Sequence, residues 1–199
     1  MQLTLDYFQQ EDVLKLGQDL LGKYLMTHMD GLLTGGQIVE VEVYRGPEDR
    51  ASHAWNNRRT KRNAVMYEEG GACYVYWCYG IHALFNIVAH KKEVPHAILI
   101  RAIQPEIGVE TMLERRKSSR LSRATAGGPG ALTQALGITV KHNGLLLTGP
   151  FIWVEDRGVT VPLKEIVCSP RVGIDYAGED ALLPWRYRIK DNLWTSPAK

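Results

Sequence analysis

Residues 37–44, QIVEVEVY, show a two-residue alternation of apolar and polar side chains, and this alternation predicts a β-strand. Successive side chains of a strand point to opposite faces, so the two kinds of side chain separate here. One face carries Val39, Val41 and Val43, and the other carries Glu40, Glu42 and Tyr44. The valine face is predicted to pack in the core. On spacing alone, the polar face is typical of an edge strand whose glutamates face solvent.

Further short segments of β type occupy much of the chain. Residues 72–79 and 83–89 are rich in aromatic and branched side chains, and they are joined through YGIH at residues 79–82. This pattern predicts a hairpin with Tyr79 near its tip. Additional strands are predicted at residues 97–103, 151–155, 171–175 and 186–189.

Helices are predicted at separate points along the chain. Residues 13–25 carry apolar side chains near a 3.6-residue period, and residues 104–116 are also expected to be helical. The glycine-rich segment GGPG at residues 127–130 introduces a short helix over residues 131–136. Neighbouring strands with scattered helices predict an α+β domain built on an antiparallel sheet. The length of 199 residues fits one domain, residues 1–199.

Composition excludes several classes of protein. Hydrophobic residues make up 45% and charged residues 23%, which excludes a disordered chain, a collagen-like repeat and a coiled coil. No apolar run approaches the roughly 18 residues of a membrane-spanning helix, and the N-terminal stretch does not have the layout of a signal peptide. The cytoplasm is therefore the expected location, with association with the nucleoid if the chain is bacterial. The three cysteines are expected to be reduced thiols.

Positive charge is concentrated in two segments, although the net charge is only +2. Residues 50–63 hold five cationic side chains and no acidic one, and residues 114–123 hold five against one acid. Such patches are expected of a surface that binds nucleic acid. A solvated charged face is the more common explanation of any single run.

Aromatic side chains near Glu42 suggest a site for a planar ligand. Tyr74 and Tyr76 share one face of their strand, and Tyr44 and His53 lie close in sequence. Stacking on aromatic rings holds an unpaired base, whereas ordinary packing is the alternative for each tyrosine alone. A metal site is disfavoured, since five residues of strand place the Cys73 and Cys78 side chains on opposite faces, about 16 Å apart. No metal or cofactor is expected.

Several motifs, in order along most of the chain, resemble the alkyladenine (3-methyladenine or methylpurine) DNA glycosylase family. These motifs are IVEVEVYRGPEDRASH at residues 38–53, TKRN at 60–63, YVY at 74–76 with Tyr79, Gly80 and Asn86, LIRA at 99–102, GPG at 128–130, QAL at 134–136 and RVGI at 171–174. The resemblance implies one domain with a curved antiparallel sheet, a protruding hairpin and surrounding helices. It also implies a monofunctional enzyme, active as a monomer on double-stranded DNA.

The resemblance further implies a reaction. After base flipping, the enzyme would hydrolyse the N-glycosidic bond of an alkylated or deaminated purine and so initiate base-excision repair. Glu42 would activate the attacking water, which Arg101 and the backbone carbonyl of Val172 would help to hold. Glu40, two residues away on the same face, is expected to matter much less. The preferred lesion stays open among 3-methyladenine, 7-methylguanine, hypoxanthine and ethenoadenine.

Roles in substrate and DNA binding follow from the same resemblance. Tyr44, His53 and Tyr76 would line the pocket around the flipped base, and Asn86 would crowd the exocyclic amino group of normal guanine. Tyr79 would fill the gap that the flipped nucleotide leaves in the duplex. Phosphate contacts are expected from Thr60 and Arg62, and the run of cationic residues at 50–63 adds Arg58 to this expectation.

Two residues depart from the family pattern. Ala131 stands where the family usually has lysine, and Lys61 stands where proline is common. Both positions belong to the expected DNA surface rather than to the pocket. Two alternatives stay open: a non-catalytic module that binds damaged or single-stranded nucleic acid, and a hydrolase of another nucleoside bond.

Overall fold

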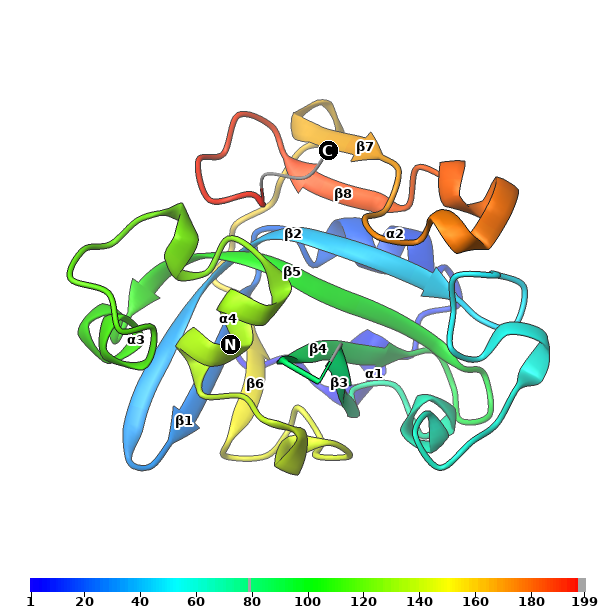
Figure 1. Cartoon of the computed structure of the whole chain (residues 1–199), viewed down its shortest axis with the longest axis horizontal. Coiled ribbons are helices and arrows are strands. Elements are labelled where there is room, and N and C mark those ends of the chain that lie inside the picture. Colours follow the sequence, from blue (N-terminus) through cyan, green and yellow to red (C-terminus); the bar gives the residue numbers. More distant parts are fainter. Residues whose placement is uncertain (79, 197–199) are drawn as a thin grey trace.

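The long strand β2 (Leu32–Arg45) is the element to which much of the fold is attached. The computed structural model describes residues 1–78 and 80–196, and within them eight strands form one open antiparallel sheet (Figure 1). β2 pairs with β5 (His96–Ile107) along one edge. Its other edge is divided between β1 (Tyr24–Met29) and β8 (Arg186–Ile189). Register shifts between β2 and β5 accompany the curvature of the sheet.

The predicted hairpin is present as β3 (Cys73–Cys78) and β4 (His82–Ala89), although Tyr79 lies outside the described residues. β4 also pairs with β5, so the hairpin extends the sheet on that side. At the other end, β6 (Ile152–Glu155) pairs with β1. β7 (Ile166–Ser169) pairs only with β8 among the described strands.

Short helices surround the sheet. They are α1 (Leu5–Phe8), α2 (Val13–Asp19), α3 (Val109–Arg115) and α4 (Pro129–Leu136). Single 3-10 turns occur at Trp55–Asn57, Ala64–Tyr67, Arg123–Thr125, Val140–His142 and Leu163–Glu165, and a longer segment at Asp175–Leu182. α2 packs on β2, and α4 packs on β4 and β5. No helix within residues 1–78 and 80–196 is long and apolar enough to cross a membrane.

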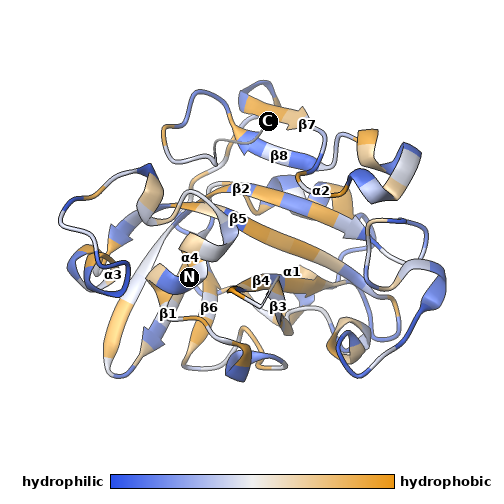
Figure 2. Ribbon diagram, in the orientation of Figure 1, coloured by the Kyte–Doolittle hydropathy of each residue, from blue (hydrophilic) through white to orange (hydrophobic). Residues whose placement is uncertain are grey.

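The core lies on β2, β4 and β5. Figure 2 shows that the central part of β5 is continuously hydrophobic, whereas β2 also carries hydrophilic segments. The fully buried apolar side chains include Phe8, Leu16, Leu20, Val41, Val43, Phe85, Ile87, Ile98, Ile100 and Leu132. The valine face of β2 therefore packs in the core as predicted. The edge-strand alternative is wrong, because Glu40 and Glu42 are also fully buried on an internal strand.

Three predicted elements differ from the structure. The first long helix ends at Asp19, because Gly22 has a φ of +88° and the chain then enters β1. The helix expected from residue 104 starts only at Val109, after β5. Residues 171–175 form a loop and the start of a 3-10 segment instead of a strand. β7 was not predicted.

Close packing of α2 on β2 generates a stability prediction at Gly17. Alanine in the middle of a helix normally stabilises it by about 0.5–1 kcal/mol relative to glycine. A Cβ at position 17 would lie 2.5 Å from Val43 Cγ2, so Gly17→Ala is expected to destabilise the protein by about 1–3 kcal/mol in urea unfolding. Val43→Ala should relieve the clash, so the double variant should lose less than the sum of the single losses. A Gly17→Ala variant as stable as the parent would contradict this packing.

Candidate active site

A cavity of about 750 Å³ opens between the hairpin, the start of α4 and the loops that carry His53 and Val172. Its lining includes eight of the residues to which the sequence assigns a role in catalysis or binding: Glu42, Tyr44, His53, Arg62, Tyr76, Asn86, Arg101 and Val172. Arg58 and Thr60 are exposed on a neighbouring loop and do not line it. Tyr79 is not among the described residues. The predicted pocket and catalytic residues thus converge on one place.

Glu42 lies at the base of this cavity and is held by three donors. The backbone N–H of Val172 donates to Oε1 at 2.7 Å, and the Tyr44 hydroxyl donates to Oε2 at 2.8 Å. Arg101 Nη1 lies 3.3 Å from Oε1. The backbone contact uses the N–H of Val172, a different atom from the carbonyl to which the sequence assigns a role. An ionised carboxylate can accept about four hydrogen bonds, so these donors leave room for one more, from a water.

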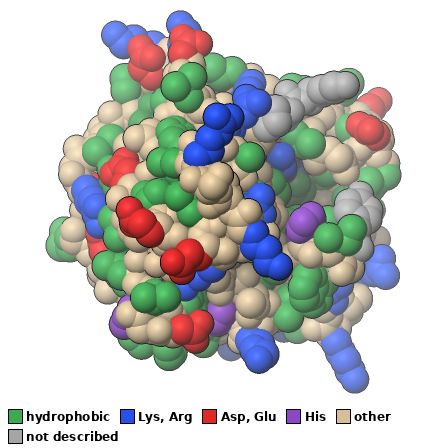
Figure 3. Space-filling view, turned by 60° about the vertical axis from the view of Figure 1, so that its left-hand side comes forward, with side chains coloured by type: hydrophobic (Ala, Val, Ile, Leu, Met, Phe, Trp, Pro, Cys, Tyr) green, Lys and Arg blue, Asp and Glu red, His purple; other side chains and the backbone are tan. Residues whose placement is uncertain are grey.

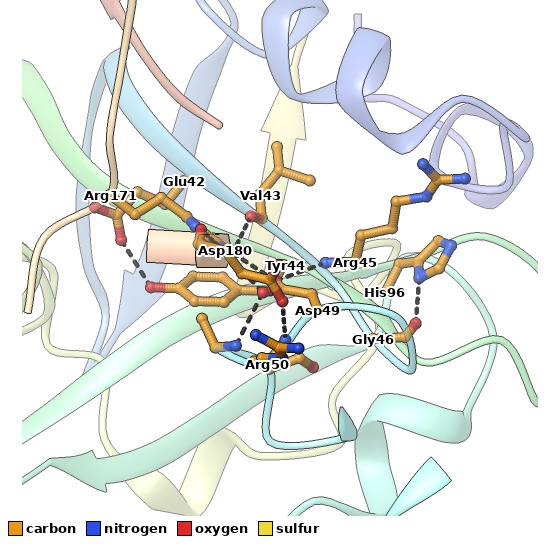
Figure 4. A network of polar contacts seen from close by, with 12 residues as sticks. Glu42, Val43, Tyr44, Arg45, Gly46, Asp49, Arg50, His96, Arg171 and Asp180 are labelled. Atoms are coloured by element: carbon orange, nitrogen blue, oxygen red, sulfur yellow. Dashed lines mark hydrogen bonds and ion pairs between the residues drawn. The ribbon is translucent and has the colours of Figure 1, made fainter. Parts of the chain in front are cut away.

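Tyr44 is fixed on both its ring and its hydroxyl. Burial, and next the charge of Glu42, raise the pKa of Tyr44 well above its ordinary value, so the hydroxyl stays protonated and donates. The Arg171 guanidinium lies 4.8 Å from the centre of the Tyr44 ring. Figure 4 shows the hydroxyl pointing to Glu42 and the ring beside Arg171. Glu42 and Tyr44 therefore form one rigid unit.

The buried pair of Arg171 and Asp49 holds the two loops of the site together (Figure 4). Arg171 Nη1 and Nη2 both donate to the Asp49 carboxylate, and Nη1 also donates to the Val43 carbonyl at 2.9 Å. Asp49 also accepts the backbone N–H of Ala51 at 2.9 Å. Because Val172 follows Arg171 directly, this pair fixes the N–H that contacts Glu42.

Three rings form a wall of the cavity. The His53 ring packs edge-on against Tyr76 with a centroid distance of 4.7 Å, and Tyr74 lies 5.2 Å from Tyr76. His53 Nδ1 and the Tyr74 hydroxyl oxygen are 2.7 Å apart and share a hydrogen bond. Asn86 Nδ2 donates to the Tyr74 carbonyl at 3.1 Å, which fixes the Asn86 side chain at the cavity. The wall is thus a connected unit.

His53 is neutral at physiological pH. Burial, and next the cations Arg62 and Arg58, lower its pKa from 6.5 to about 4. One ring nitrogen is bonded to Tyr74, which leaves Nε2 to face a ligand either as donor or as acceptor. The histidine can therefore hydrogen-bond to a polar ligand without adding positive charge to the wall.

The arginines near the cavity differ in whether an acidic side chain already pairs with them. Arg62 donates to the Trp77 carbonyl at 3.1 Å and lies 5.0 Å from the centre of the Tyr76 ring, at the cavity. Arg59 instead forms an exposed bidentate pair with Glu93. Figure 3 shows Lys and Arg side chains in a row beside a hollow in the molecular surface. Because Glu93 already pairs with Arg59, the basic segment at residues 50–63 is only partly available to a partner.

The second basic segment, residues 114–123, is partly structural. Arg115 donates to the Thr34 hydroxyl and to the Ala135 carbonyl, both at 3.2 Å, so it ties α3 to β2 and α4. Arg116 bonds to Gln134. Lys117, Arg120 and Arg123 are exposed. Thus only part of this segment offers charge to solvent.

Some residues of the site were not assigned roles from sequence. Asp49 has no signal that separates it from a surface acid, since its partner Arg171 is distant along the chain. His82, Leu99 and the start of α4 also line the cavity. For the start of α4, the glycine-rich segment GGPG was the signal in the sequence that could have indicated a place in the site.

Comparison with known proteins identifies the class of enzyme. The methylpurine-DNA glycosylase family model matches residues 6–193, nearly the whole chain. The chain therefore belongs to the methylpurine-DNA glycosylase family, and it is a DNA N-glycosylase, an enzyme of DNA repair.

Relatives of the chain match over almost their full length. A protein of Chlamydia felis named "Putative 3-methyladenine DNA glycosylase" is 45% identical over 184 residues, which cover 92% of this chain and 93% of the relative. Proteins of the same name from Bacillus licheniformis and Bacillus subtilis are 40% and 41% identical over 189 residues, covering 95% of this chain and 94% of each relative.

The environment of His53 predicts a pH dependence of stability. Its folded pKa of about 4 lies below the ordinary 6.5, so the unfolded chain binds the proton first as the pH falls. The contribution of His53 is complete above pH 6.5 and is lost progressively as the pH falls towards 4. His53→Gln should therefore lose less stability than the parent between pH 7 and pH 5 in urea unfolding. Equal losses, or a folded imidazole that titrates near 6.5 by NMR, would contradict the assignment.

Proposed function

We propose that this enzyme hydrolyses the N-glycosidic bond of alkylated or deaminated purines in double-stranded DNA, after the damaged nucleotide has been flipped into the cavity. 3-Methyladenine is the substrate in the names of the relatives. The observation that carries the proposal is Glu42, a carboxylate held by three donors at the base of an aromatic cavity. In this proposal residues 1–199 act as one domain and as a monomer in the cytoplasm.

Glu42 acts as the general base. Its remaining acceptor site takes a proton from a water, and that water attacks C1′ of the deoxyribose as the base leaves. The carboxylate also stabilises the positive charge that develops on the sugar. Arg101 and Val172 orient Glu42 and the water. Among the described residues that line the cavity there is no lysine, which supports attack by water over an amine nucleophile.

The aromatic wall selects the leaving base. Alkylation at N3 or N7 makes a purine cationic, and the faces of Tyr44 and Tyr76 attract a cation while they stack on the ring. His53 offers Nε2 to an edge of the base. Asn86 crowds the exocyclic amino group of normal guanine. Damaged or mispaired bases also need less unstacking energy to enter the cavity, so flipping itself adds selectivity.

The flanking loops bind the duplex. Arg62 contacts phosphate beside the cavity, and Arg58 and Thr60 extend this contact along the strand. Asn63 Oδ1 accepts from the Thr60 N–H at 2.7 Å and from its hydroxyl at 3.1 Å, which orders this loop. Tyr79, which lies outside the described residues, fills the gap left in the duplex in this proposal.

The role of Glu42 predicts the outcome of a substitution. Glu42→Gln keeps the shape and the bond to Tyr44 but cannot accept a proton, so single-turnover excision should slow by about 10² to 10⁴. Equilibrium binding to the same lesion duplex should persist or strengthen, since a negative charge has been removed. Glu110→Gln, an exposed change of the same charge on α3, is the matched control.

Two results would refute the proposal. Excision by Glu42→Gln at the parental rate would exclude Glu42 as the base. A parent that binds lesion duplexes but excises none of the four candidate bases would leave the chain as a binding module.

The difference between Arg62 and Arg59 predicts a difference in salt dependence. Arg62→Ala should lower the slope of log binding constant against log salt concentration by roughly one, because one phosphate contact is lost. Arg59→Ala is the matched control and should change the slope less, since Glu93 already pairs with Arg59. Equal slopes for the parent and Arg62→Ala would remove Arg62 from the phosphate contacts.

A further inference from the structure

Glu40 is a second buried carboxylate on β2, and the mechanism above does not use it. Its Oε1 accepts from Arg101 Nε at 2.7 Å, from Arg186 Nε at 2.9 Å and from the Ser196 hydroxyl at 2.7 Å. Its Oε2 accepts the backbone N–H of Ser196. Only an ionised carboxylate, which has acceptors alone, matches four donors. Burial raises the pKa of Glu40, but Arg101 and Ser196 outweigh it and hold that pKa below its ordinary value.

Arg101 is shared between the two carboxylates. Its Nε makes the shorter contact with Glu40, and its Nη1 lies 3.3 Å from Glu42 Oε1. The bond to Glu40 fixes the plane of the guanidinium, because Nε is the atom nearest to the side-chain stem. Arg101 is also buried, so the low local dielectric strengthens both contacts. Glu40 therefore fixes the position of the Arg101 guanidinium and so sets the positive potential that Arg101 exerts at Glu42.

We propose that Glu40 is a positioning residue for catalysis, which acts through Arg101 to set the orientation and the basicity of Glu42. This inference rests on the proposed role of Glu42 as the general base. Without the charge of Glu40, no neighbouring negative charge would offset the positive potential of Arg101 and Arg186 at Glu42. A carboxylate under a stronger positive potential holds its proton less well and is a weaker base.

Charged and titratable groups around Glu42 come from several elements, and the balance of their charges sets the sign of each expected change. The groups are Glu40 and Tyr44 on β2, Arg101 on β5, Arg186 on β8 and Arg171 on the loop after β7. Arg186 is the partner of Glu42 in the β2–β8 register and bonds to Glu40, but it does not line the cavity. Neutralising Glu40 and neutralising Arg186 should therefore move the pH dependence of Glu42 in opposite directions.

The C-terminal segment completes this arrangement. Ser196 reaches Glu40 across 156 positions of the chain and supplies two of its four donors. Arg101 Nη2 also donates to the Ser196 hydroxyl at 3.4 Å. The last described residue of the chain thus belongs to the support of the catalytic strand.

The test is the pH profile of single-turnover excision from a duplex with one 7-methylguanine. A cationic base leaves without being protonated, so the acidic limb of the profile reports the general base. Glu40→Gln should lower the plateau rate by about tenfold to a hundredfold and move the midpoint of the limb to lower pH. Arg186→Gln, which keeps a donor but loses the charge, should move the midpoint to higher pH. Both variants should bind the duplex at pH 7 nearly as tightly as the parent.

A purely structural role would give a different pattern. If both variants lose activity in parallel with stability, and both midpoints coincide with that of the parent, the proposal is wrong. If Glu40→Gln does not fold, the upward shift in Arg186→Gln still tests the sign, and an unchanged midpoint there overturns the proposal. A parental rate in Glu42→Gln overturns the proposed function, and this inference with it. If the midpoints of Glu40→Gln and Arg186→Gln shift in opposite directions while both variants stay active, the positioning role of Glu40 is supported, whichever lesion the enzyme prefers.

Discussion

Two carboxylates buried on one face of a single strand are the constraint on which this structure depends. Glu40 and Glu42 have no exposed surface, and charge in such a place is tolerated only when it is paired and fully hydrogen-bonded. The partners come from distant parts of the chain: Arg101 from β5, Arg186 from β8, Val172 from a loop and Ser196 from the C-terminal segment. The requirement to neutralise β2 therefore gathers the same elements that build the cavity.

The fold could be predicted where periodicity is unambiguous. The alternation in β2 and the two runs of the hairpin gave the antiparallel sheet, and the GGPG segment located α4. Prediction failed where the pattern of apolar side chains fits more than one kind of element. The chain through Leu20, Leu21, Tyr24 and Leu25 is compatible with a helix and with a buried strand, and only pairing with β2 and β6 selects the strand for β1. Residues 171–175 alternate in the manner of a strand, but they form a loop in which Arg171 pairs with Asp49.

Most residues that line the candidate site could be singled out from the sequence because they recur in family motifs, whereas their surroundings could not be predicted. Alternation assigns Glu40 and Glu42 to one face of a strand but does not tell whether that face meets solvent or another layer. The expected small role of Glu40 followed from its distance from Glu42 along the chain. The structure joins Glu40 to Glu42 through Arg101, a contact across 61 positions that no local pattern encodes. The Asp49–Arg171 pair spans 122 positions and is equally invisible in the sequence.

The charges of the cavity bear on the proposed binding of a cationic purine. Arg101 is engaged by two carboxylates, and Arg171 is neutralised by Asp49, so neither presents an unbalanced charge to a bound base. His53 is held neutral by burial and by neighbouring cations. Besides Arg62, which lies against the Tyr76 ring at the cavity, the remaining interactions with a positively charged ring are the faces of the tyrosines and the carboxylate of Glu42, which are both favourable. In the proposed mechanism, neutral normal purines gain less from the same wall, so discrimination would begin before the glycosidic bond is broken.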